Sequence, residues 1–89
     1  MAREHKLKCW SQYWDALEAG EKNFEVRRDD RGFQKGDFLI LQKYDNERGD
    51  YVRHYSDNKP HETRRKIKYI LTGGQLGIEP GYVVLALSK

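Results

Sequence analysis

The densest group of polar side chains in this 89-residue sequence lies between Gly20 and Arg31. The spacing sets Glu25 and Arg27 on one face of a short strand, with Lys22 at its mouth. Arginine offers a rigid fork of donors, glutamate accepts from amines or hydroxyls, and lysine supplies a point charge. The cluster predicts a cleft that binds a planar polar ligand. The alternative is a solvated face on which Glu25 and Arg27 merely neutralise each other.

Basic residues also gather in local clusters, although the net charge is only +3. One cluster runs from Arg3 to Lys8, and another runs from Arg27 to Lys35. In the second, we expect the rim of the cleft to consist of Arg28, Asp30 and Arg31. A third cluster consists of Arg64, Arg65, Lys66 and Lys68. Local clusters of this kind contact phosphate groups, so they indicate nucleic acid as a partner. The third cluster would alternatively be an outward strand face that is kept charged to prevent edge pairing.

A polar stretch that begins at Tyr44 carries rings that could stack on unpaired bases, as in RNA-binding proteins. These rings are Tyr51, His54, Tyr55 and His61. The histidines are spaced unlike metal ligands, and a single cysteine excludes a multi-thiolate site. We therefore expect neither a metal nor a cofactor.

One short helix must follow the first strand of the fold. Alternation from His5 to Trp10 predicts a half-buried strand with Leu7 and Cys9 in the core. Ser11 is the expected cap of a helix from Gln12 to Ala19, which Gly20 ends. Its apolar face is expected to pack in the core rather than to stack on a ligand. The residues of that face are Trp10, Trp14 and Leu17, with Tyr13 beside them.

Further strands are expected at Asn23–Arg27, Phe38–Leu41, Tyr51–Tyr55, Thr63–Leu71 and Tyr82–Leu87. In the first of these, Phe24 and Val26 are expected to point inward. The segment Phe38–Leu41 is expected to be buried on both faces. In Thr63–Leu71, the inward residues are expected to be Ile67, Tyr69 and Leu71. One helix and five or six short strands predict a small α+β fold. Its mostly antiparallel sheet would protect its edges by closing into a barrel, with the helix at its side.

Composition narrows the class of protein. Charged residues make up 35% of the chain and aromatic residues 12%, which is unlike a disordered composition. No apolar run approaches the ~20 residues of a membrane span, and the N-terminus lacks the apolar stretch of a signal peptide. One cysteine precludes an intramolecular disulfide. We expect a single domain over residues 1–89, soluble and cytoplasmic, with a monomer favoured.

The order of these segments resembles a known family. Gly20-x-Lys22-x-x-Glu25-x-Arg27, followed by Gly36-Asp37 and an apolar strand, resembles the ASCH domains of the PUA-like superfamily. The resemblance is closer to one branch, the DUF3850 family. It is carried by the segments Phe24–Phe33, Tyr44-Asp45, Gly49, Ile67–Gly74 and Gly81–Leu85. The resemblance implies a PUA-like β-barrel with a helix at its side. It also implies a cleft in which Lys22, Glu25 and Arg27 face a ligand, and RNA is what PUA-like domains typically bind.

Binding of RNA or a nucleotide is therefore the leading expectation, with Lys22 on a phosphate and Glu25 and Arg27 on the base edge. Some small ASCH proteins are similar to amidohydrolases of acylated cytidine, and others have been linked to RNA cleavage. In an enzyme, Lys22 and Glu25 would be the catalytic pair. However, Glu25 stands where the amidohydrolase pattern has a threonine, and a carboxylate stabilises the charged, non-nucleophilic lysine. A protein-interaction module that pairs through a sheet edge is the second alternative.

Overall fold

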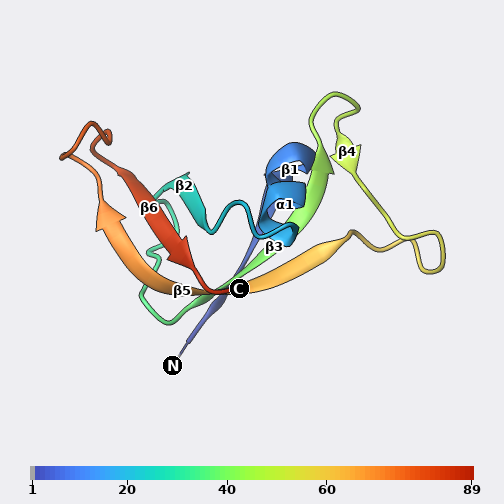
Figure 1. Cartoon of the computed structure of the whole chain (residues 1–89), viewed down its shortest axis with the longest axis horizontal. Coiled ribbons are helices and arrows are strands. Elements are labelled where there is room, and N and C mark those ends of the chain that lie inside the picture. Colours follow the sequence, from blue (N-terminus) through green and yellow to red (C-terminus); the bar gives the residue numbers. More distant parts are fainter. Residues whose placement is uncertain (1) are drawn as a thin grey trace.

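In the described part of the chain, strands form most of the regular secondary structure, and a single short helix lies between the first two of them. The computed structural model describes residues 2–89 (Figure 1). The elements are β1 (Glu4–Trp10), α1 (Ser11–Glu18), β2 (Phe24–Arg28), β3 (Phe38–Asp45), β4 (Asp50–Tyr51), β5 (Glu62–Thr72) and β6 (Tyr82–Leu87). Within residues 2–89, no helix has the length and apolarity that crossing a membrane requires.

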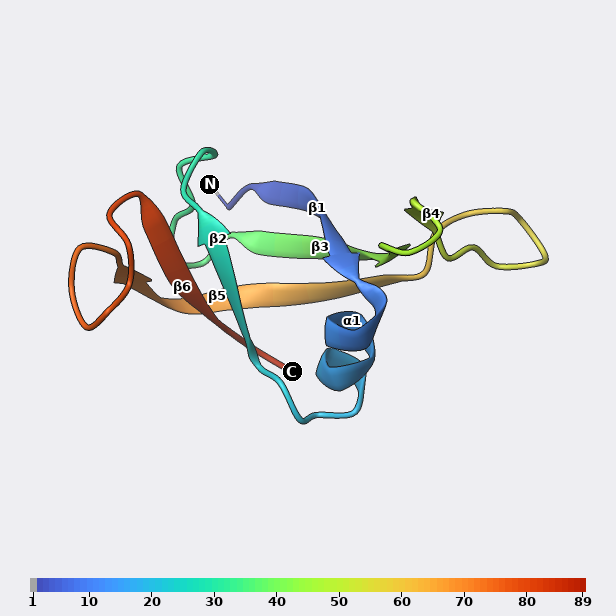
Figure 2. The same cartoon turned by 90° about the horizontal axis from the view of Figure 1, so that it is seen from above.

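The strands form one curled sheet in the order β1-β3-β5-β6-β2, and β4 pairs with the end of β3. Among the strands of residues 2–89, only β1 and β3 run parallel, and every other pair is antiparallel. The long strand β5 pairs with β3 along its first half and with β6 along its second, so the sheet curls around it (Figure 2). Helix α1 lies at the side of the sheet, near β1 and β3. The predicted small α+β fold with a mostly antiparallel sheet and one N-terminal helix is confirmed.

The core fills the inside of this curl with aliphatic side chains from four strands and the helix. Leu39 and Leu41 are fully buried and Ile40 nearly so, which confirms the expectation for these three residues, whereas Phe38 is only half-buried. The helix contributes Leu17, which is also buried. The other members of the core are Leu7, Cys9, Phe33, Ile67, Val83, Leu85 and Leu87.

The start of the helix differs from the sequence-based expectation. Trp10 is the N-cap residue, and no side chain caps the helix there. Ser11 is instead the first helical residue, and its hydroxyl donates to the carbonyl oxygen of Tyr44 over 3.2 Å. Gly20 follows the helix with a φ of +77°, as expected for a residue that ends one.

Trp10 and Tyr13 were expected in the core, and this is wrong, because each is 47% exposed. Cys9 points into the core at the end of β1, so the alternation of the strand turns Trp10 outward. A helix of eight residues can cover the sheet with only one narrow face. Leu17 and Trp14 occupy that face, and the indole Nε1 of Trp14 donates to the carbonyl oxygen of Leu41 over 3.0 Å.

Two strands also present faces other than those predicted. In β2, Phe24 and Val26 are 43% and 52% exposed, and Glu25 is the buried residue. In β5, a bulge between Ile67 and Tyr69 shifts the register, so that Tyr69 is 60% exposed and Ile70 packs against the core. Outside these two strands, the predicted strand Tyr51–Tyr55 shortens to β4 and one isolated bridge between Arg53 and Pro60.

A buried hydrogen-bonded pair fixes the start of β1 against the turn before β3. The Nε2 atom of His5 lies 2.9 Å from a carboxylate oxygen of Asp37, and both side chains are almost fully buried. The same carboxylate accepts from the backbone N–H groups of Arg3 and Gln34, each over 3.1 Å. The hydrogen bond from His5, and then those from the two backbone groups, hold the pKa of Asp37 below its usual range.

We expect Asp37→Asn to destabilise the fold by about 2 kcal/mol, a fall in Tm of roughly 10 °C, because the amide cannot accept from all three donors. Because the pKa of Asp37 is lowered in the folded protein, its carboxylate stabilises the fold at pH values above the ordinary aspartate pKa. This stabilisation is lost as the pH falls through the pKa of the folded state. The difference from the wild type should therefore narrow below about pH 4. Thermal unfolding across pH measures this. Asp57→Asn, at an exposed carboxylate that also accepts a backbone N–H, is the control. An equal effect of both changes would contradict the role of Asp37.

Candidate functional site

The carboxylate of Glu25 lies on the inner face of β2 between two cations. Its Oε1 accepts from the Nζ of Lys22 over 2.6 Å, and its Oε2 accepts from the Nε of Arg27 over 3.0 Å. The side chain of Glu25 is only 7% exposed. An unpaired charge in this position would be very costly, and the two partners make its burial possible. The structure thus brings together the three residues predicted from the sequence, but as a buried row instead of a solvated face.

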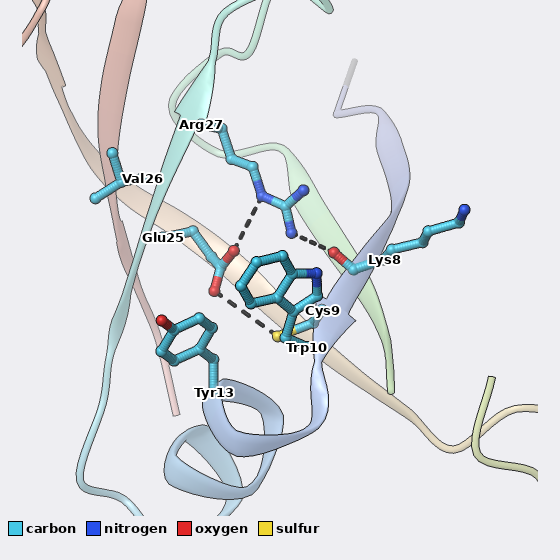
Figure 3. A pocket seen from close by; sticks show the side chains of 7 residues that line it. All are labelled: Lys8, Cys9, Trp10, Tyr13, Glu25, Val26 and Arg27. Carbon is cyan, nitrogen blue, oxygen red and sulfur yellow. Dashed lines mark hydrogen bonds and ion pairs between the residues drawn. The ribbon is translucent and has the colours of Figure 1, made fainter. Parts of the chain in front are cut away.

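Arg27 also connects the two strands at the ends of the sheet. Its Nη2 donates to the carbonyl oxygen of Lys8 on β1 (Figure 3). Four residues further along the chain, the Nη1 of Arg31 donates to the carbonyl oxygen of Lys6 over 3.1 Å. β1 and β2 do not pair as neighbouring strands in the sheet. Two guanidinium groups therefore satisfy acceptors on the free edge of β1, and they hold β2 beside it.

Cys9 lies beside this row and is nearly completely buried. Its Sγ is 3.9 Å from the Oε1 of Glu25 (Figure 3). Burial, and next the negative charge of Glu25, raise the pKa of the thiol to about 11. At neutral pH the group is a protonated thiol, which is a poor nucleophile. This burial confirms the expectation that Cys9 lies in the core.

An open pocket lies over this row, with aromatic side chains at its mouth. It has a volume of about 310 Å³ and is lined by Lys8, Cys9, Trp10, Tyr13, Glu25, Val26 and Arg27. The rings of Trp10 and Tyr13 are nearly parallel, with 12° between their planes and 6.0 Å between their centroids. Figure 3 shows both rings beside the Glu25 carboxylate, whereas the Lys8 side chain points away.

A second hollow of about 480 Å³ adjoins the first and shares Tyr13, Glu25 and Val26 with it. The Nζ of Lys22 lies there, 5.5 Å from the centroid of the Tyr13 ring and 5.0 Å from that of Phe24. The sequence interpretation missed these aromatic walls. The signal was present, because the alternation that buries Cys9 already places Trp10 on the opposite face of the strand.

The predicted rim begins at Arg28, the last residue of β2, and continues in the segment after the strand. Arg28 and Asp30 are exposed, and the guanidinium of Arg28 lies 5.7 Å from the centroid of the Tyr82 ring. Arg31 is exposed as well, although one of its nitrogens is bound to Lys6 as described above. Both residues are therefore exposed, but neither Arg28 nor Arg31 is among the residues that line the pocket.

The basic cluster on β5 divides between the two faces of that strand. Arg65 was expected on an outward face, and this is wrong: it is 8% exposed. Its Nη2 donates to a carboxylate oxygen of Glu18 over 3.1 Å and to the carbonyl oxygen of Leu17 over 3.2 Å. The cation thus pairs with a carboxylate and the C-terminal end of α1, which attaches the helix to the sheet.

The other three cluster residues, Arg64, Lys66 and Lys68, are exposed on the outer face of β5. Of these, Arg64 is engaged with neighbouring side chains. Its Nε donates to a carboxylate oxygen of Glu4 over 3.0 Å, and its guanidinium lies 3.7 Å from the centroid of the Phe38 ring.

The rings of His54 and His61 lie near each other in the segment between β4 and β5, 3.8 Å apart at their centroids. His61 also meets the edge of the Trp14 ring at 6.0 Å. Across residues 2–89, no three histidine, cysteine, aspartate or glutamate side chains converge in a way that could hold a metal ion.

Comparison with known proteins assigns the family. The model of the family described as "Domain of unknown function (DUF3850)" matches residues 4–87, so the chain belongs to this family. The chain is also similar to an uncharacterized 12.9 kDa protein in the GpA 3′ region of Escherichia phage P2, with 39% identity over 44 residues. That match spans 49% of this chain and 40% of the phage protein.

We expect Glu25→Gln to lower the thiol pKa of Cys9, because the change removes a negative charge that stabilises the protonated thiol. The midpoint of an NMR titration of the Cys9 Cβ chemical shift in the native protein should move to lower pH. Glu18→Gln, which also removes the carboxylate of a glutamate–arginine pair, is the control and should leave the midpoint unchanged. An identical midpoint in the wild type and Glu25→Gln would show that Glu25 does not govern the thiol.

Proposed function

We propose that this protein binds RNA, or a nucleotide-like ligand, in the pocket beside Glu25. The observation that carries the proposal is the exposed, nearly parallel pair of Trp10 and Tyr13 at the mouth of a pocket with a charged floor. Large aromatic side chains exposed together are unusual in a small domain unless they meet a ligand. Proteins that bind single-stranded nucleic acid stack bases on such rings.

In this proposal, the face of a base stacks on the aromatic pair, and its polar edge points toward the floor. Arg27 keeps a quarter of its side chain exposed, and the carboxylate of Glu25 lies next to it. A guanidinium and a carboxylate side by side offer both donors and acceptors to a base edge. Lys22 contributes by neutralising Glu25, since its Nζ already donates to Glu25 and to the carbonyl oxygen of Phe24. The exposed rim residues Arg28 and Arg31 are better placed to meet a phosphate.

The same contacts weaken the hydrolytic alternative. A lysine nucleophile or base must offer a free amine, whereas Lys22 is engaged with two acceptors. Both oxygens of Glu25 accept from cations, and Cys9 is a protonated thiol. A further argument for binding is the resemblance to ASCH domains of the PUA-like superfamily, in which RNA is the typical ligand.

We expect the wild type to bind nucleoside monophosphates and a short single-stranded RNA at low salt, as measured by isothermal titration calorimetry. Trp10→Ala should weaken binding about 5- to 150-fold, because base stacking contributes about 1–3 kcal/mol. Tyr69→Ala is the matched control, since Tyr69 is an exposed aromatic residue on β5 that does not line the pocket.

No detectable binding by the wild type at low salt would rule out the proposed function. Equal losses in Trp10→Ala and Tyr69→Ala would place the bound base outside the pocket. Release of free acid from acylated cytidine by the wild type, abolished in Lys22→Ala, would favour the enzyme instead.

A further inference from the structure

A second group of basic side chains lies away from the pocket beside Glu25. Lys35, Lys66, Lys68 and Ser88 line a cleft of about 630 Å³, and Gly36 and Ile67 complete its wall. None of these residues lines the pocket beside Glu25. Lys66 and Lys68 alternate with the buried Arg65 and Ile67. The cleft is therefore on the outside of the curled sheet, whereas Glu25 faces the inside.

Backbone contacts bring these lysines together from distant parts of the chain. The N–H of Gly36 donates to the carbonyl oxygen of Ile67 over 2.9 Å. The N–H of Ile67 donates to the carbonyl oxygen of Asp37 over 2.8 Å. The turn that carries Lys35 is thus attached to β5 between Lys66 and Lys68. The register shift between Ile67 and Tyr69 makes Lys68 the extra residue of a bulge, and bulges reorient side chains in this way.

Ser88 adds a hydroxyl that is held in place at the same cleft. Its Oγ accepts from the backbone N–H of Lys66 over 2.9 Å, and its own N–H donates to the carbonyl oxygen of Lys66 over 2.9 Å. With its oxygen used as an acceptor, the hydroxyl still has its proton to donate to a ligand. The cleft therefore offers three ammonium groups and one hydroxyl donor.

The positive charge of the cleft is not compensated by neighbouring acids. In the part of the chain that the structure describes, ion pairs engage Arg64 with Glu4 and Arg65 with Glu18, but none engages the three lysines of the cleft. No carboxylate is among the residues that line the cleft. An uncompensated cluster of lysines attracts anions, and lysine ammonium groups bind phosphate as point charges.

We infer that this lysine cleft, formed by Lys35, Lys66, Lys68 and Ser88, binds the phosphate backbone of the same RNA strand whose base occupies the pocket. The inference rests on the proposed function. The connection from β2 to β3 begins directly after Arg28, which follows the pocket residue Arg27, and it reaches the cleft at Lys35. Arg28, at the end of β2, and Arg31, on the connection, are exposed between the two places, with the carboxylates of Asp29 and Asp30 between them. A mononucleotide then reaches only the pocket, whereas a longer strand reaches both.

The test compares uridine monophosphate with single-stranded oligouridylates of increasing length, at several salt concentrations. The triple variant Lys35→Ala, Lys66→Ala, Lys68→Ala should bind uridine monophosphate as the wild type does, which also shows that it is folded. For long oligouridylates it should lose affinity, and the slope of log K against log salt should shrink by about 2, at roughly 0.7 per lost phosphate contact. The control triple variant Arg48→Ala, Arg53→Ala, Lys59→Ala changes the net charge equally, at exposed positions around β4.

The two proposals fail in different ways. Absence of uridine monophosphate binding by the wild type would overturn the pocket assignment. With that binding intact, an unchanged salt slope for long oligouridylates in the lysine variant would overturn the inference about the cleft alone. The role of the cleft would also be contradicted if the control variant lost as much affinity and slope as the lysine variant.

Discussion

The carboxylate of Glu25 lies out of water between Lys22 and Arg27, and this buried row of charges constrains the structure around it. β1 and β2 are not paired in the sheet, so they depend on side chains to stay together. Arg27 provides that contact by binding Glu25 with one nitrogen and the backbone of Lys8 with another. A neutral residue at position 25 would leave two cations facing each other in the interior, a costly arrangement. Side-chain ion pairs and hydrogen bonds thus hold β1 and β2 together where no backbone ladder joins the two strands.

The same row of charges determines the chemistry of the pocket. Because the glutamate is already neutralised, the floor is polar without carrying a large net charge, which suits recognition of a base edge better than attraction of any anion. Trp10 and Tyr13 supply the stacking surface above it. Among the described residues, lysines that take part in no ion pair lie elsewhere, at the cleft of Lys35, Lys66 and Lys68. In the proposed complex, the pocket reads a base and the cleft holds the backbone, which separates specificity from general affinity.

Much of the secondary structure could be predicted from the sequence, because runs such as Phe38–Leu41 are apolar without interruption and turns carry glycine. The side-chain directions were less predictable. At Tyr69, a one-residue bulge reversed the alternation, and no pattern in the sequence marks such a bulge. At β2, two apolar residues alternate with two charged ones, and hydrophobicity alone favours burying Phe24 and Val26. The structure buries Glu25 instead, because partners on both sides neutralise it.

The sequence by itself determined the class of fold, the family and the grouping of Lys22, Glu25 and Arg27, since these follow from local patterns and their order. Only the tertiary structure decided which charges are available to a ligand. Arg65 binds Glu18, 47 residues away in the chain, while its neighbours Lys66 and Lys68 stay exposed. Lys35 lies near those two lysines because the backbone of Gly36 is hydrogen-bonded to that of Ile67. Pairing between distant charges depends on distance in space, and a linear pattern contains no such distances.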